Sequence, residues 1–324
     1  MHHVRDSQMY GQIKLFAGTS CRTLADEIAA YLSLPLSGRD IIKFPNENIF
    51  VRLHASVRGQ DCYVIQTTSP PVSDNLLELL IAVQTLRLDS AARITVVIPY
   101  LSYARSDKKD QPRVPITARL VADLIQVAGA DRYICMDLHA GQIQGFFSIP
   151  GDVLTAFHIL SDYFVKIRGR LKDPVIVTAD LGFAKKGRNF AARLNCSMAF
   201  VEKRRTGNDA NAHALTVIGD VQDRDVIIVD DEVDTAGSVS QAVNIVKQHG
   251  ARHIYLSFVH PVLSPPAIDR LRNLPITEIV TTNTVPIPPE KMLPNLRILS
   301  VASLPGEVIK RAHEGRSVGE MFNE

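Results

Sequence analysis

The residues best suited to chemistry in this sequence follow one short apolar segment. Residues 226–229 are apolar and mostly β-branched, which predicts a buried strand, and Asp230, Asp231 and Asp234 come directly after it. A turn of four small residues then leads into a predicted helix, and these residues are Thr235, Ala236, Gly237 and Ser238. Backbone N–H groups and hydroxyls at such a turn can hold a phosphate, and paired carboxylates suit the adjacent hydroxyls of a ribose. The segment therefore predicts a site for a phosphorylated sugar.

The same acidic segment has a purely structural interpretation. Asp234 or Ser238 could serve as the N-cap of the following helix, which is a common use of both residue types. Adjacent carboxylates repel one another, however, and cost stability unless cations or hydroxyl groups compensate their charge. This repulsion favours a ligand site over a simple cap.

Polar residues follow three other predicted strands. The strand at 133–137 ends in Asp137-Leu-His139, the strand at 175–177 ends in Thr-Ala-Asp180, and the strand at 198–201 ends in Glu-Lys203-Arg-Arg205. Carboxylate oxygens and imidazoles at strand ends favour metal and phosphate ligands. A Lys-Arg-Arg segment is in many proteins only a solvated surface, and this alternative stays open for residues 203–205.

The elements that must position these residues alternate between strand and helix, as in a parallel sheet. The alternation starts again after a loop at 145–151, which predicts two similar α/β domains, 1–151 and 152–324, with the packing of the last helix on the N-terminal domain left open. The expected strands are 14–18, 62–66, 94–99, 133–137, 175–177, 198–201, 225–231, 253–258, 278–282 and 297–301. The expected helices are 24–32, 74–88, 115–127, 153–167, 238–249 and 304–313, and a further helix is expected after the Gly- and Lys-rich turn that follows Asp180.

Composition bounds the class of protein. A chain of 324 residues predicts about two domains, and a net charge of +2 argues against a nucleic-acid-binding or membrane-surface protein. The four cysteines are far apart and form no Cys-x-x-Cys pair, so neither a zinc site nor a disulfide framework is indicated. The N-terminus lacks an apolar signal segment and the chain lacks a long apolar run, so we expect a cytoplasmic location.

Residues 226–238 resemble the ribose-phosphate-binding signature of the type I phosphoribosyltransferase fold, with a departure at Glu232, where that pattern has an apolar residue. From about Lys14 to Phe322 the chain is similar to the ribose-phosphate pyrophosphokinase family, also called phosphoribosyl pyrophosphate synthetases. The segments that carry this resemblance include Lys14-Leu-Phe-Ala-Gly18, Arg113-Val-Pro-Ile-Thr117 and Asp137-Leu-His-Ala-Gly-Gln-Ile-Gln-Gly-Phe-Phe147. The resemblance implies an α/β fold of two tandem type I phosphoribosyltransferase-like domains, each a mostly parallel sheet flanked by helices.

The family's reaction transfers the β,γ-pyrophosphoryl group of Mg-ATP to the anomeric hydroxyl of ribose 5-phosphate and releases AMP. The resemblance implies that His139 and Asp180 hold Mg²⁺ and that Lys203 and Arg205 are a catalytic pair on a mobile loop that closes over the site. It implies ATP contacts from Phe44, Asn46, Arg105, Asp107 and His139, and ribose 5-phosphate contacts from Asp230, Asp231 and residues 234–238. From the residues alone, Phe44 could equally be a core residue, and His139 could simply bond a backbone carbonyl.

Several positions depart from the family's pattern. Ser106 replaces a Gln, Asn48 replaces an adenine-side Glu, and Ala236 replaces the first Gly of the phosphate turn. Phe183 is the largest departure, because the usual Gly there lets backbone approach pyrophosphate and a ring could crowd the ligand. Ala302 replaces a Ser that the family associates with control by phosphate.

These observations leave three hypotheses for function. The first is an active synthetase, and the second is a weakened or regulatory subunit, which the departures at 48, 106 and 183 motivate. The third is a phosphoribosyltransferase that uses a base as acceptor, which the signature at 226–238 alone would allow. ATP and ribose 5-phosphate are the expected partners, with no nucleic acid or membrane, and the resemblance implies a homo-oligomer, typically a hexamer.

Overall fold

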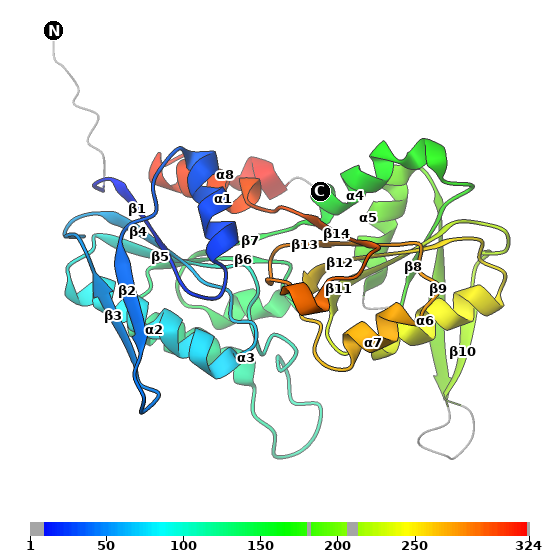
Figure 1. The fold of residues 1–324 in the computed structure, drawn as a ribbon, viewed down its shortest axis with the longest axis horizontal. Coiled ribbons are helices and arrows are strands. Elements are labelled where there is room, and N and C mark those ends of the chain that lie inside the picture. Colours follow the sequence, from blue (N-terminus) through cyan, green and yellow to red (C-terminus); the bar gives the residue numbers. More distant parts are fainter. Residues whose placement is uncertain (1–9, 180–182, 206–212, 323–324) are drawn as a thin grey trace, which may run out of the picture. The chain divides into compact units, whose positions relative to one another are not determined.

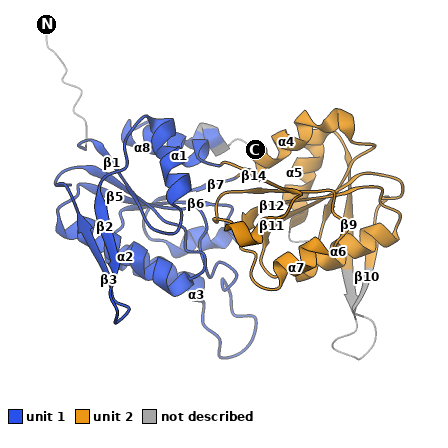
Figure 2. Cartoon of the chain, viewed as in Figure 1, with its two compact units in different colours: residues 1–155, 301–323 blue, residues 156–300, 324 orange. Residues whose placement is uncertain are grey.

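The computed structural model describes residues 10–179, 183–205 and 213–322, which form two compact units (Figure 2). Unit 1 contains the chain up to Thr155 together with residues 301–323, and unit 2 contains residues 156–300. The division after Thr155 lies close to the predicted boundary near Gly151. The closing segment differs from the simple division into 1–151 and 152–324, because its helix α8 (Ser303–His313) packs against α1 (Arg22–Leu32) in unit 1.

Unit 1 is built around a five-stranded parallel sheet in the order β1-β4-β5-β6-β7. Its strands are β1 (Ile13–Ala17), β4 (Asp61–Ile65), β5 (Arg93–Ile98), β6 (Arg132–Met136) and β7 (Gly151–Leu154). Helices α2 (Val72–Leu88) and α3 (Thr117–Ala128) cover one face, and α1 and α8 cover the other (Figure 1). An antiparallel hairpin of β2 (Arg39–Lys43) and β3 (Ile49–Leu53) packs against α2. The central strands β4 and β5 are buried along their whole length, which explains why most of their residues are apolar; Asp61 and Arg93 at their starts are charged and pair with each other.

Unit 2 contains a seven-stranded sheet in the order β10-β9-β8-β11-β12-β13-β14, parallel except for the β9–β10 pair. Its strands are β8 (Val175–Thr178), β9 (Ser197–Arg205), β10 (His213–Ile218), β11 (Val226–Val233), β12 (Ile254–Pro261), β13 (Glu278–Thr282) and β14 (Leu296–Leu299). Helices α4 (Phe157–Lys166) and α5 (Ala184–Leu194) lie on one face, and α6 (Gly237–Gln248) and α7 (Ala267–Arg272) on the other (Figure 1). Short 3₁₀ segments complete the two units at Gly141–Phe146, Arg168–Arg170, Pro289–Lys291 and Gly319–Phe322.

Four elements differ from the sequence-based expectation. The predicted helix at 153–167 is wrong at its start, because residues 151–154 form the edge strand β7, which pairs with β6 and whose Asp152 accepts from Arg132 at 2.8 Å. Strands β2 and β10 and helix α7 were not predicted, whereas β3 follows the alternating apolar pattern at 49–53. Among the described helices, none combines the length and the apolar character needed to cross a membrane.

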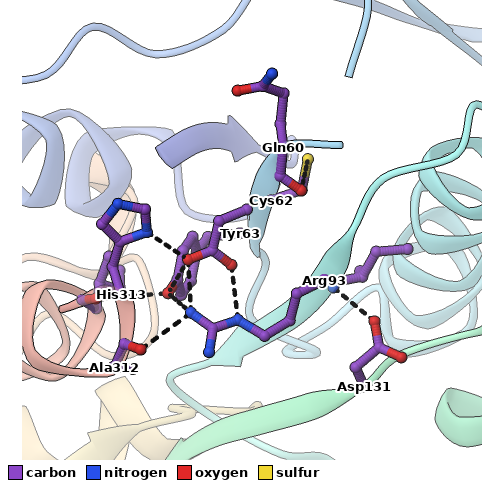
Figure 3. Close-up of polar contacts among 10 residues, drawn as sticks. Gln60, Cys62, Tyr63, Arg93, Asp131, Ala312 and His313 are labelled. Atoms are coloured by element: carbon purple, nitrogen blue, oxygen red, sulfur yellow. Dashed lines mark hydrogen bonds and ion pairs between the residues drawn. The ribbon is translucent and has the colours of Figure 1, made fainter. Parts of the chain in front are cut away.

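A buried ionic cluster ties α8 to the sheet of unit 1. Asp61 is fully buried and accepts from Arg93 Nε at 2.8 Å and Arg93 Nη2 at 2.6 Å, and His313 Nδ1 lies 2.8 Å from its second oxygen. Figure 3 shows Arg93 reaching both Tyr63 and the carbonyl of Ala312 in α8, at 3.1 and 3.2 Å. Burial, with the Asp61 charge, raises the pKa of Tyr63, so its hydroxyl stays protonated and donates to Asp61 at 3.0 Å. The C-terminal helix is therefore held by charge as well as by packing.

Candidate functional site

Strand β11 carries Asp230, Asp231 and Glu232 at its carboxyl end, in unit 2. The strand continues two residues beyond its predicted end at Asp231, to Val233, through pairing of residues 232 and 233 with β12. Asp231 is 7% exposed, and the N–H groups of Asp231 and Glu232 each donate to the carboxylate of the preceding residue at 2.9 Å. Burial and the charges of Asp231 and Glu232 raise the pKa of Asp230 well above its usual range. Hydroxyl groups or a cation at this strand end would relieve that repulsion.

We expect Asp230→Asn to stabilise the protein, because it removes a buried charge that neighbouring carboxylates repel. The folded-state pKa of Asp230 lies above its unfolded value, so its penalty is absent below the unfolded pKa and grows as the pH rises toward the folded one. At pH 7 the free energy of unfolding should rise by on the order of 1 kcal/mol, which is typical when a strained site group is removed. Denaturant unfolding at pH 7 and pH 4 measures this gain, which should shrink at the lower pH; a loss of stability at pH 7 would contradict the charge argument.

The turn after β11 leaves the start of α6 without a side-chain cap. The interpretation of Asp234 or Ser238 as N-cap is wrong: Ala236 occupies that position, and no side chain bonds the first turn of the helix. The N–H groups of Gly237, Ser238 and Val239 donate to no other residue in the described part of the chain. Unsatisfied N–H groups at a helix start favour an anion, so the geometry suits a phosphate group.

Ala236 adopts a left-handed conformation, with φ 60° and ψ 18°, and is 4% exposed. This conformation costs a non-glycine residue roughly 1–2 kcal/mol. We expect Ala236→Gly to raise the free energy of unfolding by about 1 kcal/mol because glycine adopts φ > 0 freely. Thermal or denaturant unfolding measures the change. Ala242→Gly, the same substitution inside α6, should lower the free energy of unfolding by about 1 kcal/mol or more. If both variants change the free energy of unfolding in the same direction, the backbone of Ala236 is not strained.

Sequence reasoning missed Arg270, which supports this turn. Its Nη1 donates to the carbonyl of Thr235 at 2.8 Å from helix α7. Because α7 is a six-residue helix that was not predicted and lies far along the chain, only the folded structure brings the arginine to the turn.

In unit 1, His139 follows β6 at the carboxyl edge of the sheet and is exposed. The chain bends there because Asp137 has φ 38°, and Thr155 Oγ1 donates to the buried Asp137 carboxylate at 2.9 Å. An exposed imidazole at a strand end can bind a metal ion or hydrogen-bond a phosphate oxygen. Asp180, its expected partner, lies outside the described residues, and within the described ranges no three His, Cys, Asp or Glu side chains converge as a metal site.

Two loops at the same edge are joined by Asp107. Asp107 is 8% exposed and accepts a hydrogen bond from Gln142 Nε2, which belongs to the segment after His139. Arg105 is exposed two residues earlier in the chain. The structure therefore brings Asp107 next to the segment that carries the expected metal ligand.

Phe44 and Asn46 lie at the tip of the β2–β3 hairpin. Phe44 is 45% exposed and its ring centroid lies 6.0 Å from that of Phe50, so the interpretation of Phe44 as a core residue is wrong. Asn46 Oδ1 accepts from the N–H of Asn48 at 3.2 Å, and Phe44 N–H donates to the carbonyl of Asn48 at 2.9 Å. The hairpin tip thus presents an aromatic face that a planar ligand could stack on.

The expected catalytic pair has its backbone in β9. Lys203 pairs with Leu215 and Arg205 with His213 in the antiparallel β9–β10 ribbon, whereas the sequence-based expectation was a loop. The connecting residues 206–212 lie outside the described residues. Phe183, the largest departure from the family pattern, precedes α5 with an ordinary φ of −90°, and Lys186 Nζ lies 5.4 Å from its ring centroid.

Comparison with known proteins gives a consistent result over nearly the whole chain. Residues 13–129 match the N-terminal domain of ribose phosphate pyrophosphokinase, and residues 207–323 match the phosphoribosyl synthetase-associated domain. The ribose-phosphate pyrophosphokinase of Caldanaerobacter subterraneus subsp. tengcongensis is 47% identical over 311 residues, which cover 96% of this chain and 98% of the relative. That of Aquifex aeolicus is 43% identical over 310 residues, which cover 96% and 99%.

Among solved structures, phosphoribosylpyrophosphate synthetase from Mycobacterium smegmatis superimposes with a TM-score of 0.89 at 38% identity, and the match covers 94% of this chain and 100% of that chain. This match and the two mainly parallel sheets confirm the predicted α/β architecture of two phosphoribosyltransferase-like domains. By fold, by its two matched domains and by identity over nearly its full length, the chain belongs to the ribose-phosphate pyrophosphokinase family, a family of transferases.

Proposed function

We propose that the chain transfers the pyrophosphoryl group of Mg-ATP to the anomeric hydroxyl of ribose 5-phosphate, giving phosphoribosyl pyrophosphate and AMP. The observation that carries this proposal is the end of β11, where uncapped N–H groups of α6 adjoin the crowded carboxyl group of Asp230. The N–H groups can donate to a phosphate, and the neighbouring carboxyl group can accept from sugar hydroxyls. Together they match the two ends of one sugar phosphate. The relatives that match over nearly the whole chain are named ribose-phosphate pyrophosphokinase, which favours this reaction over a base phosphoribosyltransferase or a regulatory subunit.

On the sugar side, the N–H groups and hydroxyls of residues 235–238 would bind the 5-phosphate. Asp230, Asp231 and Asp234 would accept from the ribose hydroxyls, and Arg270 holds the turn in place through the carbonyl of Thr235. This arrangement fixes the anomeric hydroxyl relative to the strand end, and such positioning is a large part of catalysis in phosphoryl chemistry.

On the nucleotide side, Phe44 and Asn46 would hold the adenine, and Arg105 would bind the triphosphate. His139 and Asp180 would hold the magnesium ion, which fits the exposed imidazole after β6 and the hard-oxygen chemistry of the carboxylate. When bound, the metal neutralises charge on the triphosphate oxygens. Asp107 and Gln142 keep the two loops in register while ATP binds.

In the transfer, the anomeric hydroxyl oxygen forms a bond to the β-phosphorus as the bond from that phosphorus to the α–β bridging oxygen breaks. The hydroxyl proton passes to solvent and AMP leaves with the bridging oxygen. Lys203 and Arg205 would place positive charge on the migrating group and on the leaving oxygen, where negative charge increases in the transition state. A covalent enzyme intermediate is not needed.

The test is an AMP-formation assay on the purified chain with Mg-ATP and ribose 5-phosphate. We expect AMP only when both substrates are present, in equal amount to phosphoribosyl pyrophosphate. No AMP at high enzyme concentration would overturn the proposal in favour of the weakened or regulatory subunit. Release of pyrophosphate that depends on a nucleobase would favour the base transferase instead. The family resemblance also leads us to propose a cytoplasmic location and a homo-oligomer. Sedimentation of the purified chain would measure the oligomeric state.

A further inference from the structure

Unit 2 contains a cavity at the edge of its sheet that lies away from the candidate site. It has a volume of about 390 Å³ and lies at the amino ends of β12, β13 and β14, beneath the end of α4. The acidic residues and the phosphate turn follow the carboxyl end of β11, which runs parallel to β12. Opposite ends of parallel strands lie at opposite edges of a sheet, so this cavity is separate from the candidate site.

One wall of the cavity is the ion pair of Glu278 and Arg297, in which the carboxylate oxygens of Glu278 already accept hydrogen bonds from the protein. Glu278 accepts from the hydroxyl of Tyr163 at 2.7 and 2.8 Å and from Arg297 Nε at 2.7 Å. Arg297 also lies over the Tyr163 ring, 5.1 Å from its centroid, which fixes the plane of the guanidinium. The Glu278 charge is balanced by Arg297, and little of its acceptor capacity remains for a ligand.

The remaining polar groups of the cavity are mainly donors. Arg297 uses its Nε for Glu278 and also interacts with the Tyr163 hydroxyl, and its terminal nitrogens still keep N–H donors for a further acceptor. Arg170 also lines the cavity, and its guanidinium makes neither a hydrogen bond nor an ion pair with any described residue. Tyr255 is 9% exposed, and its hydroxyl likewise bonds to nothing in the described ranges. Two guanidinium groups against one carboxylate leave the cavity with net positive charge.

We propose that this cavity binds a small organic anion, a compact apolar body that carries a phosphate or carboxylate group. Guanidinium groups bind both kinds of anion through paired hydrogen bonds. Ile167, Pro294 and Leu296 supply apolar walls for the body of the ligand. A volume of about 390 Å³ lies within the range of small-molecule sites. The proposal does not depend on the reaction at the other edge of the sheet.

Methyl NMR on the full chain tests the proposal with three probes: phenyl phosphate, benzoate and the neutral benzyl alcohol. We expect phenyl phosphate, benzoate or both to shift the methyl signals of Ile167 and Leu296 in a saturable way, and benzyl alcohol to leave them unchanged. The stronger of the two anions identifies the preferred acid group. Arg170→Gln should weaken this binding about tenfold or more, because a charge-assisted hydrogen bond is lost without loss of any contact that Arg170 makes in the fold.

Arg272→Gln is the matched control, because Arg272 is an exposed arginine of the same unit, paired with Asp269 outside the cavity. It should leave the titration unchanged. Binding that is equally tight in Arg170→Gln, anion shifts confined to methyl groups outside the cavity, or equal shifts with benzyl alcohol would each overturn the proposal. The AMP assay is a separate measurement, so failure of this site and failure of the proposed reaction are distinguished.

Discussion

Lys203→Ala is expected to lower the rate of AMP formation at saturating substrates at least about a hundredfold, as loss of one preorganised charge on a transition state does. The resemblance assigns this lysine to the catalytic pair, and the structure places its backbone in β9, paired with Leu215. The Michaelis constants should change much less than the rate, because new negative charge develops on the leaving oxygen only in the transition state.

The control for this variant is Lys310→Ala, which removes an exposed lysine from α8 and should leave the rate within about twofold. Lys203→Arg keeps the charge on a different group and should recover only part of the rate, since the two cations present donors differently. A double Lys203→Ala, Arg205→Ala variant should lose less than the product of the single effects if the pair acts as a unit. A Lys203→Ala rate within threefold of the unchanged enzyme would sink the assignment.

The parts of the fold that the sequence predicted are those with strong local patterns. The strand predicted at 225–231 and the helix predicted at 74–88 follow from apolar patterns. The bounds of β11 and α2 lie within two residues of these predictions. Strand β7 was mistaken for the start of a helix, because Val153 and Leu154 run into an apolar helix and only their pairing with β6 makes them a strand. The local sequence does not show that β6 is available to pair with these residues.

The candidate site divides in the same way. Its acidic strand end and its small-residue turn are contiguous in sequence, so they could be recognised directly. The contacts that support them join distant segments: Arg270 reaches Thr235 from α7, and Gln142 reaches Asp107 from the next loop. The exposure of Phe44 depends on the hairpin that carries it. These contacts and this exposure arise from tertiary packing, so they could not be predicted from local residue types and spacing.

Asp61→Ala is expected to cost about 3–5 kcal/mol of unfolding free energy, the usual result when one partner of a buried ion pair is removed. Arg93 would keep its charge, with its side chain 9% exposed and its counterion gone. Its Nη2 also donates to the carbonyl of Ala312, and His313 lies 2.8 Å from the Asp61 carboxylate, so the loss should spread to α8. Denaturant unfolding measures the free energy, and hydrogen exchange should show faster exchange in α8.

Asp123→Ala provides the comparison, because Asp123 pairs with Arg119 on the exposed surface of α3 at 2.9 Å. Solvent screens that pair, so its loss should cost less than about 0.5 kcal/mol. If the two variants unfold with the same free energy, or if exchange in α8 is unchanged in Asp61→Ala, the cluster does not hold the helix. A large loss with faster exchange in α8 would mean that the C-terminal segment is attached to the sheet of unit 1 by buried charge, which explains why residues 301–323 belong to that unit although they follow unit 2 in sequence.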